Sequence, residues 1–148
     1  MKKWWLIGIV LLISILAFAY YAISPLFITL EGSDAAPVSE GSASREIAVA
    51  QVVDTPAHPA SGTVKVIEAD GKTYVRYENY ETINGPDIFV YLAKDLDAQE
   101  FVELGRVKAT VGNANYEVLS GVDVSEYRYV LTWCKAFGVL FNYADIGM

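Results

Sequence analysis

The stretch from Gly62 to Asn79, GTVKVIEADGKTYVRYEN, contains the strongest local structural signal in the chain. Two runs rich in Val, Ile, Thr and Tyr flank the pair Asp70–Gly71, which is typical of a two-residue β-hairpin turn. In the second run, Val75 and Tyr77 alternate with more polar neighbours, as expected of a half-buried strand. The stretch therefore predicts an antiparallel hairpin of residues 62–69 and 72–79.

Further short strands are predicted on both sides of this hairpin. Residues 88–93 form an apolar run that is entered through NGPD at residues 84–87, where Gly and Pro supply turn geometry. Seven or eight short strands predict an all-β fold, either an antiparallel β-sandwich or a flattened barrel. The remaining predicted elements are strands at 46–53, 105–110, 116–119, 129–133 and 137–141, helical turns at 95–101 and from Asp123, and a tight turn at 112–115.

The first thirty residues predict a membrane anchor. Lys2 and Lys3 precede an uncharged run from Trp4 to Leu30, which is long enough for a helix to span a hydrocarbon core of ~30 Å. The two lysines favour an N-terminus in the cytoplasm and a C-terminal domain outside it. The alternative is a cleaved signal peptide, because Ala17–Ala19 has a small-x-small pattern. Since the apolar run continues beyond that site, we expect an uncleaved signal-anchor of a single-pass cell-membrane protein.

Composition divides the rest of the chain into a linker and one domain. Residues 31–44 are rich in Gly, Ser, Ala and Pro, which predicts a flexible tether. We therefore assign residues 1–30 to the anchor, 31–52 to a linker that ends in a first strand, and 53–148 to a β domain. Without the two N-terminal lysines, nine basic residues face eighteen acidic ones, a formal charge of −9. We expect no nucleic-acid partner on this balance.

Five blocks of the sequence resemble the DM13 domain family in order and spacing over residues 53–146. The resemblance implies an all-β extracytoplasmic module, a hallmark cysteine in the Trp-Cys block and a role in electron transfer. The blocks are AHPASG at 57–62, NGPDIFVYL at 84–92, Leu104–Gly105, Gly112 with Asn115–Tyr116, and WCKAF at 133–137 followed by Phe141.

Cys134 is the only cysteine, so it has no partner for an internal disulfide. In a chain delivered outside the cytoplasm, such a thiol is buried packing, a partner for another molecule or a redox group. Burial in apolar surroundings makes a thiol inert, and a nearby cation activates it. Lys135 is adjacent, but neighbours on a strand point to opposite faces. We predict Cys134 as a redox thiol or ligand, near solvent at one end of the sandwich.

His58 is the only histidine, and we predict it as the partner of Cys134. If the fold brought the two together, they would form a thiolate–imidazolium pair or supply one nitrogen and one sulfur ligand. The alternative is a solvated loop histidine between Pro56 and Pro59. No metal site is predicted, because zinc requires about four ligands and the chain has one Cys and one His.

The sequence identifies no cofactor. No C-x-x-C-H block is present, so covalent c-type attachment of haem is excluded. Non-covalent haem would need an apolar cleft, and Trp133 and Phe137 are the residues that we assign to cofactor binding in such a cleft. Tyr129, Phe141 and Tyr143 could complete it, although core packing is the simpler explanation of these aromatic residues.

The favoured function is therefore a membrane-tethered redox module that works with an unknown protein or redox partner. The alternative is a non-catalytic β-sandwich that binds a protein or glycan, with Cys134 as part of the structural core. The sequence contains no nucleophile elbow, Walker loop or Rossmann fingerprint, so hydrolase and nucleotide-dependent functions have no support. Whether the chain is an enzyme stays open.

Overall fold

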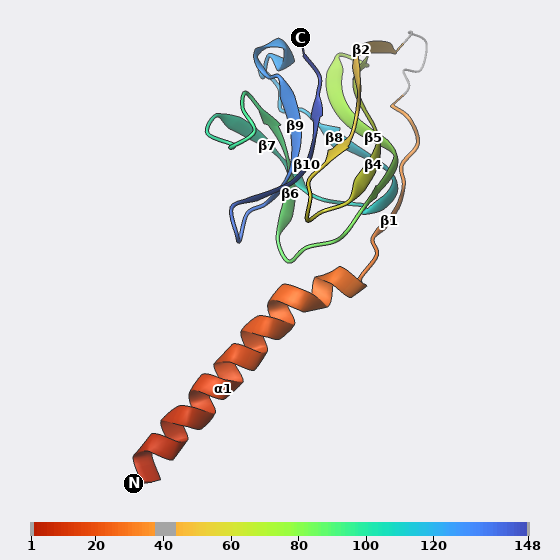
Figure 1. Ribbon diagram of the computed structural model, residues 1–148. Coiled ribbons are helices and arrows are strands. Elements are labelled where there is room, and N and C mark those ends of the chain that lie inside the picture. Colours follow the sequence, from red (N-terminus) through yellow and green to blue (C-terminus); the bar gives the residue numbers. More distant parts are fainter. Residues whose placement is uncertain (1, 38–43, 148) are drawn as a thin grey trace.

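The computed structural model describes residues 2–37 and 44–147, in which a long helix leads into a β-sandwich (Figure 1). α1 (Lys2–Ile23) continues into the short 3-10 helix η1 (Ser24–Phe27). Pro25 lies in the first turn of η1, where its missing amide proton costs no hydrogen bond. The helical segment Lys3–Phe27 is not buried, and its length and composition are sufficient to cross a bilayer.

The described residues contain ten strands in two five-stranded sheets. All neighbouring strands are antiparallel except β1 and β8, which are parallel. The sheets do not close into a barrel. Of the two architectures predicted from the sequence, the structure therefore confirms the β-sandwich. The first sheet has the order β1 (Glu31–Ser33), β8 (Val111–Glu117), β5 (Lys72–Thr82), β4 (Ala60–Ala69), β2 (Arg45–Gln51), and the second has the order β3 (Val53–Asp54), β10 (Val139–Asp145), β9 (Tyr129–Cys134), β6 (Ile88–Ala93), β7 (Phe101–Arg106).

The predicted hairpin is confirmed as β4 and β5, with Ala69 opposite Lys72 at its closed end. Asp70 and Gly71 have φ values of 49° and 73°. Positive φ at both central residues is what a type I′ turn requires, and it explains why Asp-Gly is found there. The predicted strand at 88–93 coincides with β6.

The predictions for residues 95–110 are wrong in position. β7 spans Phe101–Arg106 rather than 105–110, and residues 95–100 form an irregular loop rather than a helical turn. The carboxylate of Asp95 accepts hydrogen bonds from the backbone amides of Asp97 and Gln99, at 2.9 and 3.0 Å. An Asp side chain that binds amides in this way favours a loop over a continuing helix.

Residues 112–115 do not form the predicted turn, because they lie inside β8. Gly112 has a φ of 104°, and a side chain there would overlap the carbonyl group of Gly32 in β1. The glycine is therefore explained by the close approach of two strands rather than by a reversal of the chain. The helical turn predicted from Asp123 is present as η2 (Val124–Glu126).

Part of the segment predicted as a flexible tether is bound to the sandwich. Residues 31–33 form β1, and Nη1 of Arg76 donates to the carbonyl oxygens of Asp34 and Ala35 at 3.0 and 3.1 Å. The tether prediction therefore does not hold for residues 31–35, because backbone pairing and a buried guanidinium hold them. Residues 38–43 of the predicted tether lie outside the described residues.

The main core lies between the two sheets and is built from alternate residues of their strands. Val64 and Val75 contribute from the first sheet, and Leu92 and Val130 from the second. A smaller cluster around Tyr91, Ala93 and Leu131 packs separately from this core. Because neighbours on a strand point to opposite faces, this cluster lies on the outer face of β6 and β9.

Candidate functional site: a pocket at the helix end of the sandwich

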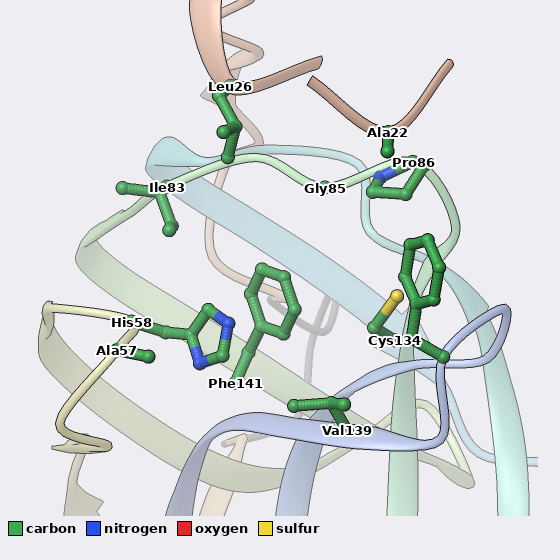
Figure 2. A pocket seen from close by; sticks show the side chains of 11 residues that line it. Ala22, Leu26, Ala57, His58, Ile83, Gly85, Pro86, Cys134, Val139 and Phe141 are labelled. Atoms are coloured by element: carbon green, nitrogen blue, oxygen red, sulfur yellow. The ribbon is translucent and has the colours of Figure 1, made fainter. Parts of the chain in front are cut away.

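A pocket of about 320 Å³ lies where the helical segment meets the sandwich (Figure 2). Its walls are formed by three segments that connect strands, together with residues next to them, and by the end of the helical segment. Almost all of its lining is apolar, and no Asp, Glu, Lys or Arg lines it. The lining residues are Ala22 and Leu26 from the helical segment, Ala57 and His58 before β4, Ile83, Gly85 and Pro86 between β5 and β6, and Cys134, Phe137, Val139 and Phe141 from β9, β10 and their turn.

Cys134 is the last residue of β9, where it pairs with Ile88 and Val139. The residue is only 1% exposed and is a free thiol. Figure 2 shows its sulfur directed towards the part of the pocket near Ala22 and Pro86. Cys134 therefore lies at one end of the sandwich beside the pocket, but it is buried rather than near solvent as the sequence predicted.

Lys135 does not activate this thiol. Its Nζ lies 2.9 Å from Oε2 of Glu103 and 4.8 Å from the ring centre of Phe89, and it does not line the pocket. The hydrogen bond to Glu103 raises the pKa of Lys135, and this pairing holds its ammonium group on the outer face of the sheet. This is the side expected for a residue next to an inward-facing cysteine.

His58 is held in the pocket wall by a short loop that Thr55 begins. The amide of His58 donates to the carbonyl oxygen of Thr55 at 3.0 Å. Nδ1 of His58 lies 3.0 Å from Oγ1 of Thr55, which in turn donates to the carbonyl oxygen of Phe141 at 2.8 Å. A threonine hydroxyl has one proton, so Oγ1 must accept from Nδ1–H of the imidazole. The neutral ring therefore carries its proton on Nδ1.

This tautomer leaves Nε2 of His58 as an unprotonated acceptor. Burial lowers the pKa of the imidazole, which favours the neutral ring near neutral pH. The hydrogen bond with Thr55 is the only one made by this side chain in residues 2–37 and 44–147. Nε2 is therefore available to a ligand. The hydrogen bond at Nδ1 fixes the orientation of the ring, as the corresponding hydrogen bond does in a metal-binding histidine.

Phe141 separates His58 from Cys134. Its ring stacks on the imidazole with a centroid distance of 3.9 Å and an interplanar angle of 19°. In Figure 2 the phenyl ring stands between the imidazole on one side and the thiol on the other. Gly85 makes this position available, because a Cβ at that residue would lie 2.8 Å from the phenyl ring. The structure thus brings both predicted residues to one pocket without a direct contact between them.

The two aromatic residues predicted for cofactor binding are placed differently. Phe137 lines the pocket and makes an edge contact with Phe18 of α1, with ring centroids 6.3 Å apart. Trp133 does not line the pocket and packs with the outer cluster around Tyr91. The strand alternation that points Cys134 inward points Trp133 outward.

The pocket offers few ligands for a metal ion. Within the described part of the chain, no three His, Cys, Asp or Glu side chains gather as a metal site would require. The sequence did not single out Thr55, nor the lining residues Ala22, Leu26, Ile83 and Val139. Thr55 precedes His58 by three residues, which is no recognised signal, and the helix residues reach the pocket only through the tertiary fold.

The fold and the pocket define a β-sandwich module that presents one thiol and one imidazole in a single apolar cavity beside an N-terminal helix. A family model described as "Electron transfer DM13" matches residues 52–146, which is more than half of the chain. The chain therefore belongs to the DM13 family, as the resemblance of its sequence blocks predicted. No curated protein and no solved structure matches it.

Proposed function

We propose that this chain is a membrane-tethered electron-transfer module whose domain lies outside the cytoplasm and whose redox group is Cys134. The observation that carries this proposal is that the single thiol and the single imidazole line one apolar pocket. Membership of the DM13 family supports electron transfer as a general role. The pocket supports Cys134 as the residue that performs it.

A single thiol exchanges electrons in pairs with an external sulfur compound. The sulfur of Cys134 attacks one sulfur of a disulfide, a new S–S bond forms, the old one breaks, and the other half leaves as a thiolate with the electron pair. The thiol proton must leave before or during attack. Nε2 of His58 is the base available in the pocket, and because Phe141 lies between, the proton reaches it through a bound molecule or water.

The proposed orientation rests on the two ends of the helical segment. Lys2 and Lys3 lie at the N-terminal end of α1, and positive charge favours the cytoplasmic side. Trp4 and Trp5 are exposed at one end of α1, and Tyr20 and Tyr21 are exposed near the other. Such aromatic residues favour the two interfaces of a bilayer. This arrangement supports a single-pass cell-membrane protein with an extracytoplasmic sandwich.

A second function is supported by the burial of Cys134. The residue is 1% exposed and belongs to the main core cluster, as a purely structural cysteine would. In that case the sandwich is a non-catalytic module that binds a protein or glycan. A haem group has less support, because a macrocycle is larger than a cavity of about 320 Å³ and Phe141 stands between the two axial-ligand candidates.

The test is a titration of the native thiol. The full chain in detergent is mixed with a coloured aromatic disulfide between pH 6 and 8, with and without denaturant. We expect one equivalent of thiol to react in the native protein, no reaction in Cys134→Ser, and slower reaction in His58→Phe. Lys135→Met is the matched control and keeps the native rate, because its ammonium faces Glu103. A thiol that reacts only after denaturation would favour the structural role.

A further inference from the structure

The pocket is fixed at the junction between the apolar helix and the sandwich. Leu26 of η1 forms part of its wall, and the chain reaches β1 only a few residues later. The side-chain amide of Asn84 donates to the carbonyl oxygen of Ile28 at 3.0 Å, and the amide of Leu30 donates to Oγ1 of Thr110 at 2.9 Å. These bonds keep the pocket at the end of the helix. With the helix in a bilayer, the pocket lies at the level of the lipid–water interface.

Apolar side chains surround this end of the sandwich. Phe27 is 84% exposed and Ile28 is 52% exposed just after the pocket wall. Phe137 and Val139, which line the pocket, are also exposed. Such a patch is costly in water and favourable against a membrane surface. These side chains offer apolar contacts to a molecule that enters the pocket from the bilayer.

The polar atoms of the pocket restrict what can occupy it. No charged side chain lines the pocket, so a charged ligand would lose its hydration without gaining a partner. Nε2 of His58 accepts a hydrogen bond because Thr55 holds the proton on Nδ1. A plain acyl chain would leave this acceptor unpaired, which is unfavourable in an apolar cavity. The matching ligand has an apolar body and a hydroxyl group that can donate to Nε2.

We propose that the pocket binds the ring of a lipid-soluble quinol, whose hydroxyl donates a hydrogen bond to Nε2 of His58. The volume of about 320 Å³ is near the lower end of the range of about 300–1,000 Å³ for small-molecule sites, so it holds one ring and leaves the tail in the bilayer. Phe141, which stacks on His58 and lines the pocket, offers an aromatic contact to such a ring. This inference goes beyond the proposed function, because it assigns a ligand to the same pocket and proposes no electron transfer between that ligand and the thiol of Cys134.

The tautomer of His58 should make the pocket selective for the quinol over the quinone. The oxidised quinone has only carbonyl oxygens, and these cannot donate to an unprotonated Nε2. We expect the quinol to bind about tenfold more tightly than the quinone near neutral pH, which is about the effect of one hydrogen bond to the partly buried imidazole. In His58→Phe, which keeps an aromatic ring but lacks the acceptor, the two forms bind equally.

The experiment uses the full chain in phosphatidylcholine nanodiscs, titrated with decyl-tailed benzoquinol and with its oxidised form. Binding is measured by partition relative to empty nanodiscs. In protein with ¹⁵N-labelled histidine, the single imidazole reports the contact directly, and we expect the Nε2 resonance to shift with quinol in a saturable way. Leu26→Trp fills the pocket from the helix side and abolishes binding. Leu16→Trp, on an exposed part of α1 away from the pocket, is the matched control.

Equal affinity for quinol, quinone and a decyl alkane would overturn the proposal in favour of a lipid-tail pocket, and so would an unchanged Nε2 resonance at saturation. Cys134→Ser distinguishes this inference from the proposed function. If quinol binding fails while the thiol of the native protein reacts, only the quinol inference is lost. If Cys134→Ser binds quinol normally and the native thiol is inert, the pocket assignment stands and the redox role of Cys134 is lost.

Discussion

Oγ1 of Thr55 lies 3.0 Å from Nδ1 of His58 and donates its proton to the carbonyl oxygen of Phe141, 2.8 Å away. Thr55 thus links the loop before β4 to β10 and determines the protonated nitrogen of the only imidazole. The same bond orients Nε2 as the free acceptor of an apolar pocket.

Thr55→Val removes this link while keeping the shape of the side chain. We expect the free energy of unfolding to fall by about 1–2 kcal/mol, because the Nδ1 proton and the carbonyl oxygen of Phe141 both lose a partner. We also expect the imidazole to lose its preference for the Nδ1–H tautomer, which ¹⁵N spectroscopy of the histidine measures. Thr55→Ser retains the hydroxyl and should keep both properties. An unchanged tautomer in Thr55→Val would contradict the assignment.

The burial of His58 predicts a dependence of stability on pH. Burial lowers its pKa in the folded protein, whereas the unfolded chain has the ordinary value of about 6.5. As the pH falls below about 6.5, the unfolded state binds the proton first, so this contribution to stability is complete above that pH and is lost on acidification towards the folded pKa. Urea unfolding at pH 7.5 and 5.5 should show a smaller loss for His58→Gln than for the native chain. Equal losses would indicate that His58 is solvated.

The buried side chain of Arg76 binds the segment that connects the helix to the β-sandwich. This side chain is 5% exposed, and it donates to Glu78, to Oδ1 of Asn115 and to the backbone of Asp34. Arg76→Met should lower the free energy of unfolding by about 2–4 kcal/mol, because several charge-assisted bonds are lost in a buried place. The exposed Arg128, paired with Asp145, is the control.

The control substitution Arg128→Met should cost less than about 1 kcal/mol, since exposed ion pairs contribute little. Amide exchange at residue 115 should rise in the Arg76 variant alone, because this amide donates to Oδ2 of Asp34. Equal stability of the two variants would mean that the segment before β2 is not anchored by Arg76.

Tyr80 connects the two sheets inside the core. Its hydroxyl donates to Oδ1 of Asn142 at 3.0 Å and lies 3.0 Å from Oγ1 of Thr132. Burial raises the pKa of Tyr80, so the phenol stays protonated. Tyr80→Phe should lower the free energy of unfolding by about 1–3 kcal/mol, because Asn142 is fully buried and loses a donor. Tyr143→Phe, measured by the same denaturant titration, should be near neutral because its hydroxyl makes no hydrogen bond among the described residues.

Much of the strand pattern could be predicted because it depends on local chemistry. The Asp70–Gly71 turn and the alternation in β5 act over a few residues, and both are observed as predicted. The errors occur where distant residues decide. Gly112 resembles a turn glycine in the sequence, but the carbonyl of Gly32, far away in the chain, explains it. Likewise, residues 31–33 have linker composition and become a strand because β8 offers them a free edge.

By itself, the sequence determined the apolar N-terminal helix, the hairpin, the DM13 family and the identity of the single thiol and imidazole, because these are properties of composition, local turn chemistry and motif spacing. The tertiary structure decided which of these groups share a cavity. His58 and Cys134 are 76 positions apart, and only the packing of β10 against both of their segments places Phe141 between them. The tertiary structure also decided that Trp133 faces away from the pocket. Side chains alternate along β9, but only the packing of one face of the strand against the other sheet determines which of them point inward.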